Sequence, residues 1–309
     1  MSGNKEKYKS FCEQRQSEVP LFQQYWWMET VCAGKHWDVL LSKGHGKVCG
    51  ALPFLYGKKF GLKYILLPQL TPWGGLWIDP TLDANSQHWV LEALAEGLRR
   101  QKAVLCMQRF APGVEVWKAF EKKGFNHTTR FTYRFDPLPK PEELPQLADR
   151  GRKRQLEAVR QAYTIDRQVG ADEFAALHTS YWERRSGHDL LSRDFITRVC
   201  STALGRGQAL LYGLRDAEGT LTAARFVAYD SHCAYALMSA MRPEALRNSM
   251  TALVWAMLTD LYGKTEAFDF EGGTDPGVGH FYSSFGAKKT ELHCIYRSRI
   301  PFGEKILHV

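Results

Sequence analysis

One order of elements occurs twice in this chain, and this repeat constrains the fold more than any other feature. In the first half, three strand-like runs precede an amphipathic helix, a short buried strand, a second helix and a last strand with alternating pattern. The second half has the same order, from "ALLYGLRD" to "TELHCIYRS". Both halves place Pro-Gly-Val at the start of their second helix, at Pro112 and Pro276, where proline is preorganised for a first helical turn. The sequence therefore predicts a tandem duplication of one α/β unit.

The repeat also predicts the domain boundary. A proline-rich linker, "DPLPKP", begins at Asp136, and 309 residues are enough for two domains that each bury a core. Two further helical segments precede the strands of the second half, so mixed sheets flanked by helices are expected. We predict an α/β (α+β) fold with domains at residues 1–140 and 141–309, in which residues 25–136 and 163–299 superpose.

Charge and cysteine usage narrow the class of protein. The net charge of +8 either favours an anionic partner, such as a coenzyme, tRNA or an acidic lipid surface, or serves solubility alone. Seven cysteines without a CxxC pair argue against a structural zinc site and fit a reducing cytoplasm. No signal-peptide core, membrane-spanning window, phosphate-binding P-loop or nucleophile elbow is found. We expect a cytoplasmic globular protein without a metal.

The segment "FDFEGGTDPGVGHFYSSFGA" places acids where a buried strand meets a helix. Phe268 and Phe270 alternate with Asp269 and Glu271, so the two acids are expected on one face of a strand, opposite the core. Asp275, directly before a proline, is expected to cap the next helix. The glycines between them permit a tight turn and the close approach of another group.

This segment resembles the strand–turn–helix of FemAB-like acetyltransferases, a branch of the GNAT superfamily that includes bacterial members. "RKRQLEAVRQAYTID" is similar to the basic helix of these proteins, and "LLPQLTPWGGLW" to a segment of their first domain. The resemblance covers most of the chain, above all residues 150–297. It implies two tandem GNAT-like domains that transfer an acyl group from a thioester or an aminoacyl ester to an amine.

The resemblance also implies a donor site at "MRPEALRNSMTALVWAM". In GNAT domains the pyrophosphate of acyl-CoA rests on the N-terminus of the helix after the fourth strand, where unpaired N–H groups and the helix dipole favour anions. The cofactor-binding residues carried over to this sequence are Arg242, Arg247, Asn248, Ser249 and Met250. The loop departs from the usual glycine-rich pattern because it contains no glycine. An ordinary capped helix with two solvated arginines is the alternative.

Three residues are the catalytic candidates that follow from the resemblance. Asp269 and Glu271 lie where GNAT acceptors bind, and a carboxylate there can position an amine or accept its proton. Tyr282 matches the tyrosine with which many GNAT enzymes protonate the leaving thiolate. The alternatives are an ion pair or a turn cap for the acids and core packing for Tyr282. His280 is either a proton shuttle or a surface residue.

Substrate contacts are expected from two other segments. Arg154 belongs to the basic run at residues 150–160, which either grips phosphates or forms a solvated helix face. Trp73 and Trp77 flank flexible glycines and either wall a substrate groove or are buried against the second domain.

The leading hypothesis is an N-acyltransferase with acyl-CoA as co-substrate and an amine-bearing small molecule or peptide as acceptor, bound in a cleft between the domains. The first alternative is a Fem-type transferase that uses aminoacyl-tRNA in cell-wall peptide synthesis. The second is a non-catalytic ligand-binding module, which the glycine-free loop keeps open. Binding of acetyl-CoA discriminates between them.

Overall fold

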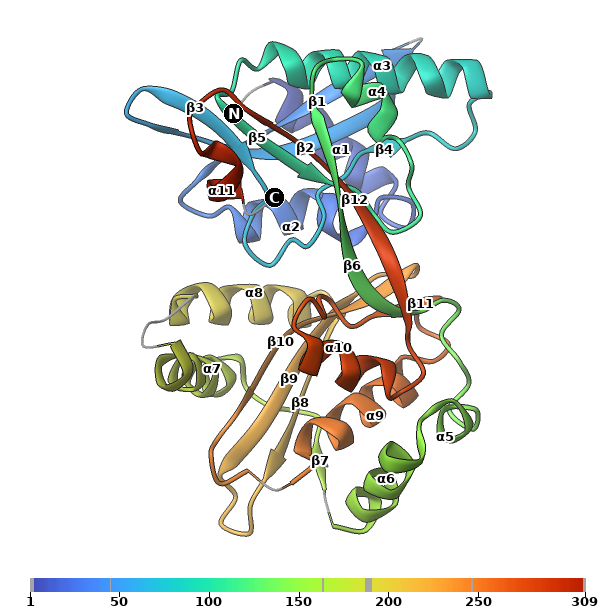
Figure 1. Cartoon of the computed structure of the whole chain (residues 1–309), viewed down its shortest axis with the longest axis vertical. Helices are drawn as coiled ribbons and strands as arrows, with labels where there is room; N and C mark the ends of the chain where they lie inside the picture. The colour runs from blue at the N-terminus through green and yellow to red at the C-terminus, as the bar shows by residue number, and fades with distance from the viewer. Residues whose placement is uncertain (1–2, 45, 163, 187–190, 246, 308–309) are drawn as a thin grey trace. The chain divides into compact units, whose positions relative to one another are not determined.

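The structure, a computed structural model, describes residues 3–44, 46–162, 164–186, 191–245 and 247–307. The chain divides into two compact units (Figure 1). Unit 1 comprises Met1–Phe131 and Thr290–Val309, and unit 2 comprises Thr132–Lys289. Two long strands, β6 (Asn126–Phe135) and β12 (Lys288–Ser298), each contribute residues to both units.

Unit 1 is a mixed sheet with helices packed on it. Its strands follow the order β1-β2-β3-β5-β12-β6, with β4 paired to β2. Helix α3 packs on the sheet through Val90, Leu94 and Leu98, which recur at helical spacing and belong to the buried core. The elements of this unit are α1 (Gly3–Gln14), the 3₁₀ helix η1 (Leu21–Gln23), α2 (Tyr25–Val31), β1 (His36–Gly44), β2 (Lys47–Lys59), β3 (Leu62–Leu66), β4 (Trp77–Ile78), α3 (Ala84–Arg100), β5 (Leu105–Arg109), α4 (Trp117–Glu121) and α11 (Gly303–Leu307).

Unit 2 has the same kind of sheet, in the order β6-β11-β10-β9-β8-β7. Strand β9 is buried along almost its whole length, as expected for a strand covered on both faces. Helix α9 packs into an apolar cluster of this unit, and 10 of its 13 residues are buried. The elements are α5 (Leu144–Leu147), α6 (Arg150–Ala162), β7 (Ile165–Asp166), α7 (Ala171–Ser186), α8 (Arg193–Gly205), β8 (Ala209–Arg215), β9 (Leu221–Tyr229), β10 (Cys233–Met241), α9 (Ser249–Leu261), β11 (Ala267–Asp269) and α10 (Pro276–Ser283).

The predicted repeat is present, but the last strands of the two copies are exchanged. The order β1-β2-β3-α3-β5-α4-β6 recurs as β8-β9-β10-α9-β11-α10-β12. Strand β12 of the second copy pairs with β5 of the first, at Ser298 and Leu105. Strand β6 of the first copy pairs with β11 of the second, at Phe135 and Phe268. The compact units therefore differ from the expected division at residue 140, because Thr290–Val309 lies in unit 1.

Two local predictions for the first copy are wrong. The sequence offers Asn85 or Ser86 as the N-cap of α3. The cap is Asp83, whose carboxylate accepts hydrogen bonds from the backbone N–H groups of those two residues. The Pro-Gly-Val at Pro112 forms a turn before α4, which begins only at Trp117. In the second copy, Pro276 does stand at the start of α10. The doubled tripeptide therefore marks equivalent places but not equivalent structures.

Candidate functional site

Strands β10 and β11 are paired only over a short stretch. Their parallel pairing runs from Cys233 and Ala267 to Tyr235 and Asp269. Strand β10 continues to Met241, and over this continuation the structure records no pairing with β11 among the residues it describes. A bulge between positions 236 and 238 bends β10 against β9 at this point. The β11 side of β10 therefore presents backbone N–H and C=O groups that β11 does not use.

Helix α9 begins at Ser249, after a connection of seven residues from the end of β10 at Met241. Its N-cap residue, Asn248, has a left-handed backbone with φ of 70°, and its side chain makes no capping hydrogen bond. Ser249 is buried and Met250 is half-buried at the first turn. The N-terminal N–H groups of a helix lack intrahelical partners. Because the N-cap side chain does not take this place, the start of α9 is suited to an anion.

The two arginines expected to assist here are placed differently. Arg242 donates from its backbone N–H to the Thr222 carbonyl (2.7 Å) and from Nε to the Leu221 carbonyl (3.0 Å), and its Nη1 lies 3.7 Å from a Glu244 carboxylate oxygen. Its guanidinium is thus held against the start of β9. Arg247 is exposed next to Asn248. Leu246 lies outside the described residues.

Asp269 is a fully buried carboxylate at the end of β11. Its Oδ1 accepts hydrogen bonds from the Thr132 hydroxyl and from the backbone N–H of Glu271, the latter at 2.8 Å. Its Oδ2 has no hydrogen-bond partner among the described residues and lies 4.0 Å from Nε of Arg134. Burial raises the pKa of Asp269 to about 6, against the hydrogen bonds and the Arg134 charge, which lower it. This carboxyl group can therefore exchange a proton near neutral pH.

Glu271 does not stand in a strand, which corrects the expectation that it shares a strand face with Asp269. Strand β11 ends at Asp269 because the chain turns there, and Glu271 adopts a left-handed backbone with φ of 54°. Such a conformation is costly for a residue with a side chain. The Asp269 carboxylate holds the turn by accepting the N–H of Glu271. Glu271 is half-buried and joins the end of the strand to the exposed turn that follows.

The glycines after Glu271 are required by a tyrosine of unit 2. Gly273 has φ of 105°, and a Cβ there would lie 2.6 Å from the Tyr133 ring. Gly279 of α10 is equally close, because its Cβ would lie 2.9 Å from the Tyr133 hydroxyl and from the carbonyl of Gly273. The close approach that the glycines permit is therefore to Tyr133.

Helix α10 carries the remaining candidate residues of the segment "FDFEGGTDPGVGHFYSSFGA". Asp275 caps it as predicted, by accepting hydrogen bonds from the N–H groups of Gly277 and Val278. Tyr282 is buried, with its ring 4.7 Å from that of Phe270 and within the apolar cluster of unit 2. This is the packing alternative for Tyr282. His280 is exposed.

The basic helix α6 is anchored by Arg152 rather than by Arg154. Arg152 donates hydrogen bonds from Nε to Ser284 Oγ (3.0 Å) and from Nη1 to Thr251, and its guanidinium stacks 4.5 Å from the Phe281 ring. Arg154 is exposed, and the side chain of Arg160 lies outside the described residues. Arg152 therefore holds α6 against α9 and α10.

Trp73 and Trp77 are both buried in unit 1. The Trp73 ring meets Phe22 edge-on at 5.3 Å, and the Trp77 ring meets Phe11 at 4.8 Å. Both tryptophans therefore pack against aromatic residues of unit 1 itself. A role as a substrate wall remains a prediction.

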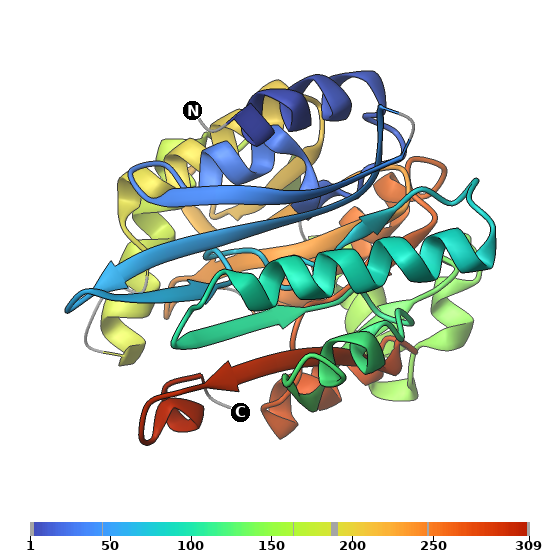
Figure 2. The same ribbon diagram turned by 90° about the horizontal axis from the view of Figure 1, so that it is seen from above.

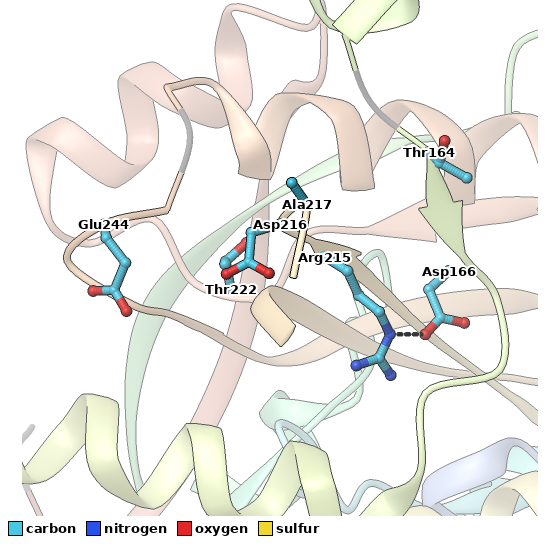
Figure 3. Close-up of a pocket in the computed structure, with 7 residues that line it drawn as sticks. All are labelled: Thr164, Asp166, Arg215, Asp216, Ala217, Thr222 and Glu244. Atoms are coloured by element: carbon cyan, nitrogen blue, oxygen red, sulfur yellow. Dashed lines mark hydrogen bonds and ion pairs between the residues drawn. The ribbon is translucent and has the colours of Figure 1, made fainter. Parts of the chain in front are cut away.

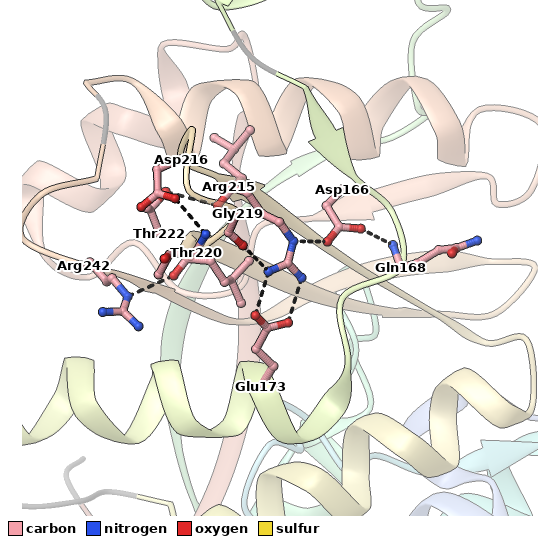
Figure 4. Close-up of polar contacts among 11 residues, drawn as sticks. Asp166, Gln168, Glu173, Arg215, Asp216, Gly219, Thr220, Thr222 and Arg242 are labelled. Carbon is pink, nitrogen blue, oxygen red and sulfur yellow. Dashed lines mark hydrogen bonds and ion pairs between the residues drawn. The ribbon is translucent and has the colours of Figure 1, made fainter.

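A cavity of about 730 Å³ lies in unit 2 between β7, the β8–β9 turn and the segment after β10 (Figure 3). Among the described residues that line it, the one cation is Arg215, which is held by Asp166 at 2.8 Å and by both oxygens of Glu173 at 2.7 and 2.8 Å (Figure 4). These carboxylates raise the pKa of Arg215 further above its usual value. The cavity therefore suits a cationic or neutral group better than a phosphate. It is lined by Thr164, Asp166, Arg215, Asp216, Ala217, Thr222 and Glu244.

The sequence reading missed two residues of β6 that contact the candidate site. Thr132 and Arg134 both face Asp269, the first by a hydrogen bond and the second at 4.0 Å. They alternate with Tyr133 and Phe135, so the polar face of this strand was visible as a pattern. The pattern does not show that β6 pairs with β11, and this pairing brings the two residues to Asp269.

The helix that corresponds to α9 in unit 1 starts differently. The carboxylate of Asp83 accepts hydrogen bonds of 3.0 Å from the N–H groups of Asn85 and Ser86 at the start of α3. The N–H groups of Gly74 and Gly75 donate to the carbonyl of Arg109, at the end of β5 (3.1 and 2.9 Å). In unit 1 the chain itself thus caps the helix and covers the end of the fourth strand.

Comparisons with known proteins identify a matching domain family and similar folds. Residues 148–278 match the model of a family described as acetyltransferase (GNAT) domain. The search of the curated proteins found no match. Among the described residues, no group of three or more His, Cys, Asp or Glu side chains is arranged to hold a metal ion, and no helix is long and apolar enough to cross a membrane.

Similar solved structures cover almost the whole chain. FemX is 14% identical with a TM-score of 0.72, over 95% of this chain and 96% of that one. A tandem GNAT protein from the clavulanic acid biosynthesis pathway is 13% identical with a TM-score of 0.56, over 95% and 94%. L-PGS from Bacillus licheniformis is 12% identical with a TM-score of 0.58, over 98% and 94%. These likenesses show the fold, which is the tandem GNAT fold of Fem-like proteins and confirms the expected architecture.

Proposed function

We propose that this chain, which has the Fem-like tandem GNAT fold and a GNAT acetyltransferase domain at residues 148–278, transfers an acyl group from acyl-CoA to an amine. The observation that carries the proposal is that β10 runs on to Met241 beyond the end of β11, and that the N-cap side chain of the following helix α9 makes no capping hydrogen bond. The edge of β10 beyond β11 and the N-terminus of α9 together suit a long anionic donor.

The two parts of this place match the two parts of coenzyme A. The backbone groups of β10 between positions 236 and 241 can hydrogen-bond to the amides of the pantetheine arm, as an added strand would. The N–H groups at Ser249 and Met250, with the dipole of α9, can receive the pyrophosphate. Arg247, exposed beside them, adds a positive charge.

The reaction needs the acceptor amine to lose a proton. The amine nitrogen attacks the thioester carbonyl, a C–N bond forms and the C–S bond breaks, and the released thiolate takes up a proton. We assign the acceptance of the amine proton to Glu271, which lies half-buried at the turn beyond β11. Asp269 acts as a positioning residue, because it holds the N–H of Glu271 at 2.8 Å. Tyr282 is packed in the core, and no step is assigned to it.

The proposal is tested with the full chain, acetyl-CoA and a panel of primary amines. Calorimetric titration with acetyl-CoA is expected to give one binding event per chain, and release of the CoA thiol is expected to depend on the amine. Absence of binding in the titration would exclude acyl-CoA as the donor.

A second candidate donor is the aminoacyl ester of tRNA. The segment between β10 and α9 has no glycine, and the cavity beside it has three carboxylates and one compensated arginine, which oppose a polyphosphate there. An aminoacyl group brings an ammonium instead. Incubation with charged tRNA and the same amines distinguishes this donor, because transfer then occurs without CoA. Failure with both donors would favour the ligand-binding module.

A further inference from the structure

Two phenylalanines of unit 1 combine high exposure with an unfavourable backbone. Phe60 is 91% exposed and Phe302 is 76% exposed. Both have left-handed backbones, with φ of 52° and 56°. A bulky residue rarely adopts this conformation, and an exposed aromatic ring gains nothing from the interior. The folded chain therefore bears a conformational cost twice in order to present a phenylalanine to its surroundings.

The turn between β2 and β3 shows how unusual Phe60 is. Lys59 pairs with Leu62, so Phe60 and Gly61 form a two-residue hairpin loop in which both residues have positive φ. This turn type strongly prefers asparagine or aspartate at the position of Phe60. Leu62, which follows the turn, is itself 47% exposed. Neither the turn geometry nor burial in the interior therefore accounts for a phenylalanine at position 60. A function of the exposed ring would account for it.

Sheet pairing brings both phenylalanines to one end of unit 1. Tyr64, two residues after Leu62, pairs with Leu105, and Leu105 also pairs with Ser298, four residues before Phe302. The β2–β3 turn, the α3–β5 connection and α11 all lie toward the left in Figure 2. We call this region, residues 58–63, 96–102 and 297–305, the phenylalanine end.

The phenylalanine end is strongly basic. It contains nine lysines and arginines and two acids, and one of these acids, Glu96, is already paired with two arginines at 2.6 and 2.8 Å. Lys305 lies 5.5 Å from the centre of the Phe302 ring, so cation and ring are adjacent. The exposed cations are Lys58, Lys59, Arg99, Arg100, Lys102, Arg299 and Lys305.

We propose that the phenylalanine end binds the surface of a membrane that contains anionic phospholipids, with Phe60 and Phe302 inserted among the headgroups. Apolar side chains surrounded by basic ones are the combination that holds a protein at a lipid interface, because the rings enter the acyl boundary while the cations meet phosphates. Leu62 extends the inserted patch.

Two other partners fit the surface less well. A nucleic acid would use the cations and could stack bases on the rings, but the aliphatic Leu62 offers no stacking face. A second copy of this chain, docked by the same end, would bring nine cations against nine. A lipid surface satisfies the exposed rings, the leucine and the cations together.

The proposal is tested by co-sedimentation of the full chain with phosphatidylcholine vesicles that contain or lack phosphatidylglycerol. Binding is expected only to the anionic vesicles and is expected to weaken as salt is added. The double variant F60N/F302N is expected to bind at least about tenfold more weakly, since it removes both inserted rings. Asparagine is favoured at positive φ, so the variant is expected to fold at least as stably as the parent.

Trp89 provides the matched control. It is 62% exposed on α3 but belongs to the first turns of that helix, away from its basic C-terminal end. W89A is therefore expected to bind vesicles like the parent. Binding that is equal for both vesicle types, or unchanged in F60N/F302N, would overturn the proposal. So would tighter binding of a polyuridylate RNA than of anionic vesicles. None of these readouts requires an acyl donor, so their outcome is independent of the proposed function.

Discussion

Helices α3 and α9 are equivalent in the element order of the two units, but they start differently. In unit 1 the Asp83 carboxylate caps α3 through two hydrogen bonds of 3.0 Å. In unit 2 the residue before α9 is Asn248, with a left-handed backbone and no capping hydrogen bond from its side chain. A carboxylate at a helix start takes the place that a phosphate would take and repels one. This difference is why the proposed anion site is placed in unit 2 and not in unit 1.

Strands β5 and β11 are also equivalent in the two copies, and the chain treats their ends differently. In unit 1, the N–H groups of Gly74 and Gly75 bond to the carbonyl of Arg109, so a segment of the chain covers the end of β5. In unit 2, β11 is followed by the turn at Glu271, which is held by Asp269. The comparison teaches that both copies of a duplicated fold can keep the same scaffold. In one copy, residues of the chain itself can occupy the position that is proposed to bind a ligand in the other.

The largest expected effect is on catalysis in unit 2. Glu271→Gln keeps the size of the side chain and its left-handed backbone but removes the proton acceptor. We expect the rate of acyl transfer to fall by about 100-fold or more, the range for positioned general bases. Tm is expected to stay unchanged, which thermal unfolding checks alongside the rate. Unchanged turnover per folded molecule, or a loss that follows a lower Tm, would remove Glu271 from the mechanism.

The second prediction concerns the pH dependence of stability. Burial raises the folded-state pKa of Asp269 from 3.8 to about 6. A raised pKa of an acid means that its ionised form destabilises the fold, with no effect below the unfolded value and the full effect above the folded value. A shift of about two units corresponds to roughly 3 kcal/mol.

Asp269→Asn removes this ionisation and is therefore expected to raise the free energy of unfolding above pH 6, with a gain that shrinks toward pH 4. Urea unfolding of parent and variant across this range measures it. A stability difference between parent and variant that does not depend on pH would contradict the raised pKa of the buried Asp269 carboxyl group. Turnover is expected to fall in the same variant, because Asp269 holds the N–H of Glu271.

Reversing a charge beside α9 is expected to have a smaller effect. Arg247→Glu places a negative charge next to the expected pyrophosphate and should weaken acetyl-CoA binding about tenfold. Arg154→Glu makes the same change on the exposed face of α6 and serves as the matched control. Calorimetry on both variants checks the prediction. Equal loss in the two would show a general charge effect in place of a local one.

The smallest effect is expected in unit 1. Asp83→Ala removes the cap of α3 and should lower Tm by a few degrees while leaving acetyl-CoA affinity and turnover unchanged. Thermal unfolding measures the change in Tm, and calorimetric titration of the same preparation measures the affinity for acetyl-CoA. An affinity for acetyl-CoA that increases on removal of the carboxylate would break the comparison, because it would place a competent donor site in unit 1.

Local patterns predicted much of the fold but little of the way its parts are joined. The repeat, the cap at Asp275 and the burial of α9 follow from turn chemistry and apolar spacing, which are properties of short segments. The exchange of β6 and β12 depends on which sheet offers each strand an edge, and no local signal encodes that choice. Thr132 and Arg134 were missed for this reason.

The sequence could place candidate site residues only where a motif fixes their position at the end of a strand or the start of a helix. Asn248 stands directly before α9 and Asp269 ends β11, and their roles at a donor or acceptor site stay predictions. The left-handed turn at Glu271 ends β11 two residues earlier than alternation suggested, because the Asp269 carboxylate competes for its N–H. The role of Arg152 as an anchor also depends on Ser284 and Thr251, which are distant in sequence.

Hydrogen–deuterium exchange with and without acetyl-CoA tests most directly whether unit 2 alone binds the donor. Peptides that cover the end of β10 and the first turn of α9, residues 237–252, are expected to gain protection, since their N–H groups would meet the pantetheine arm and the pyrophosphate. Peptides at the start of α3, residues 82–90, should exchange equally in both states. Protection at α3 in place of α9, or an unchanged pattern at saturating acetyl-CoA, would contradict the account.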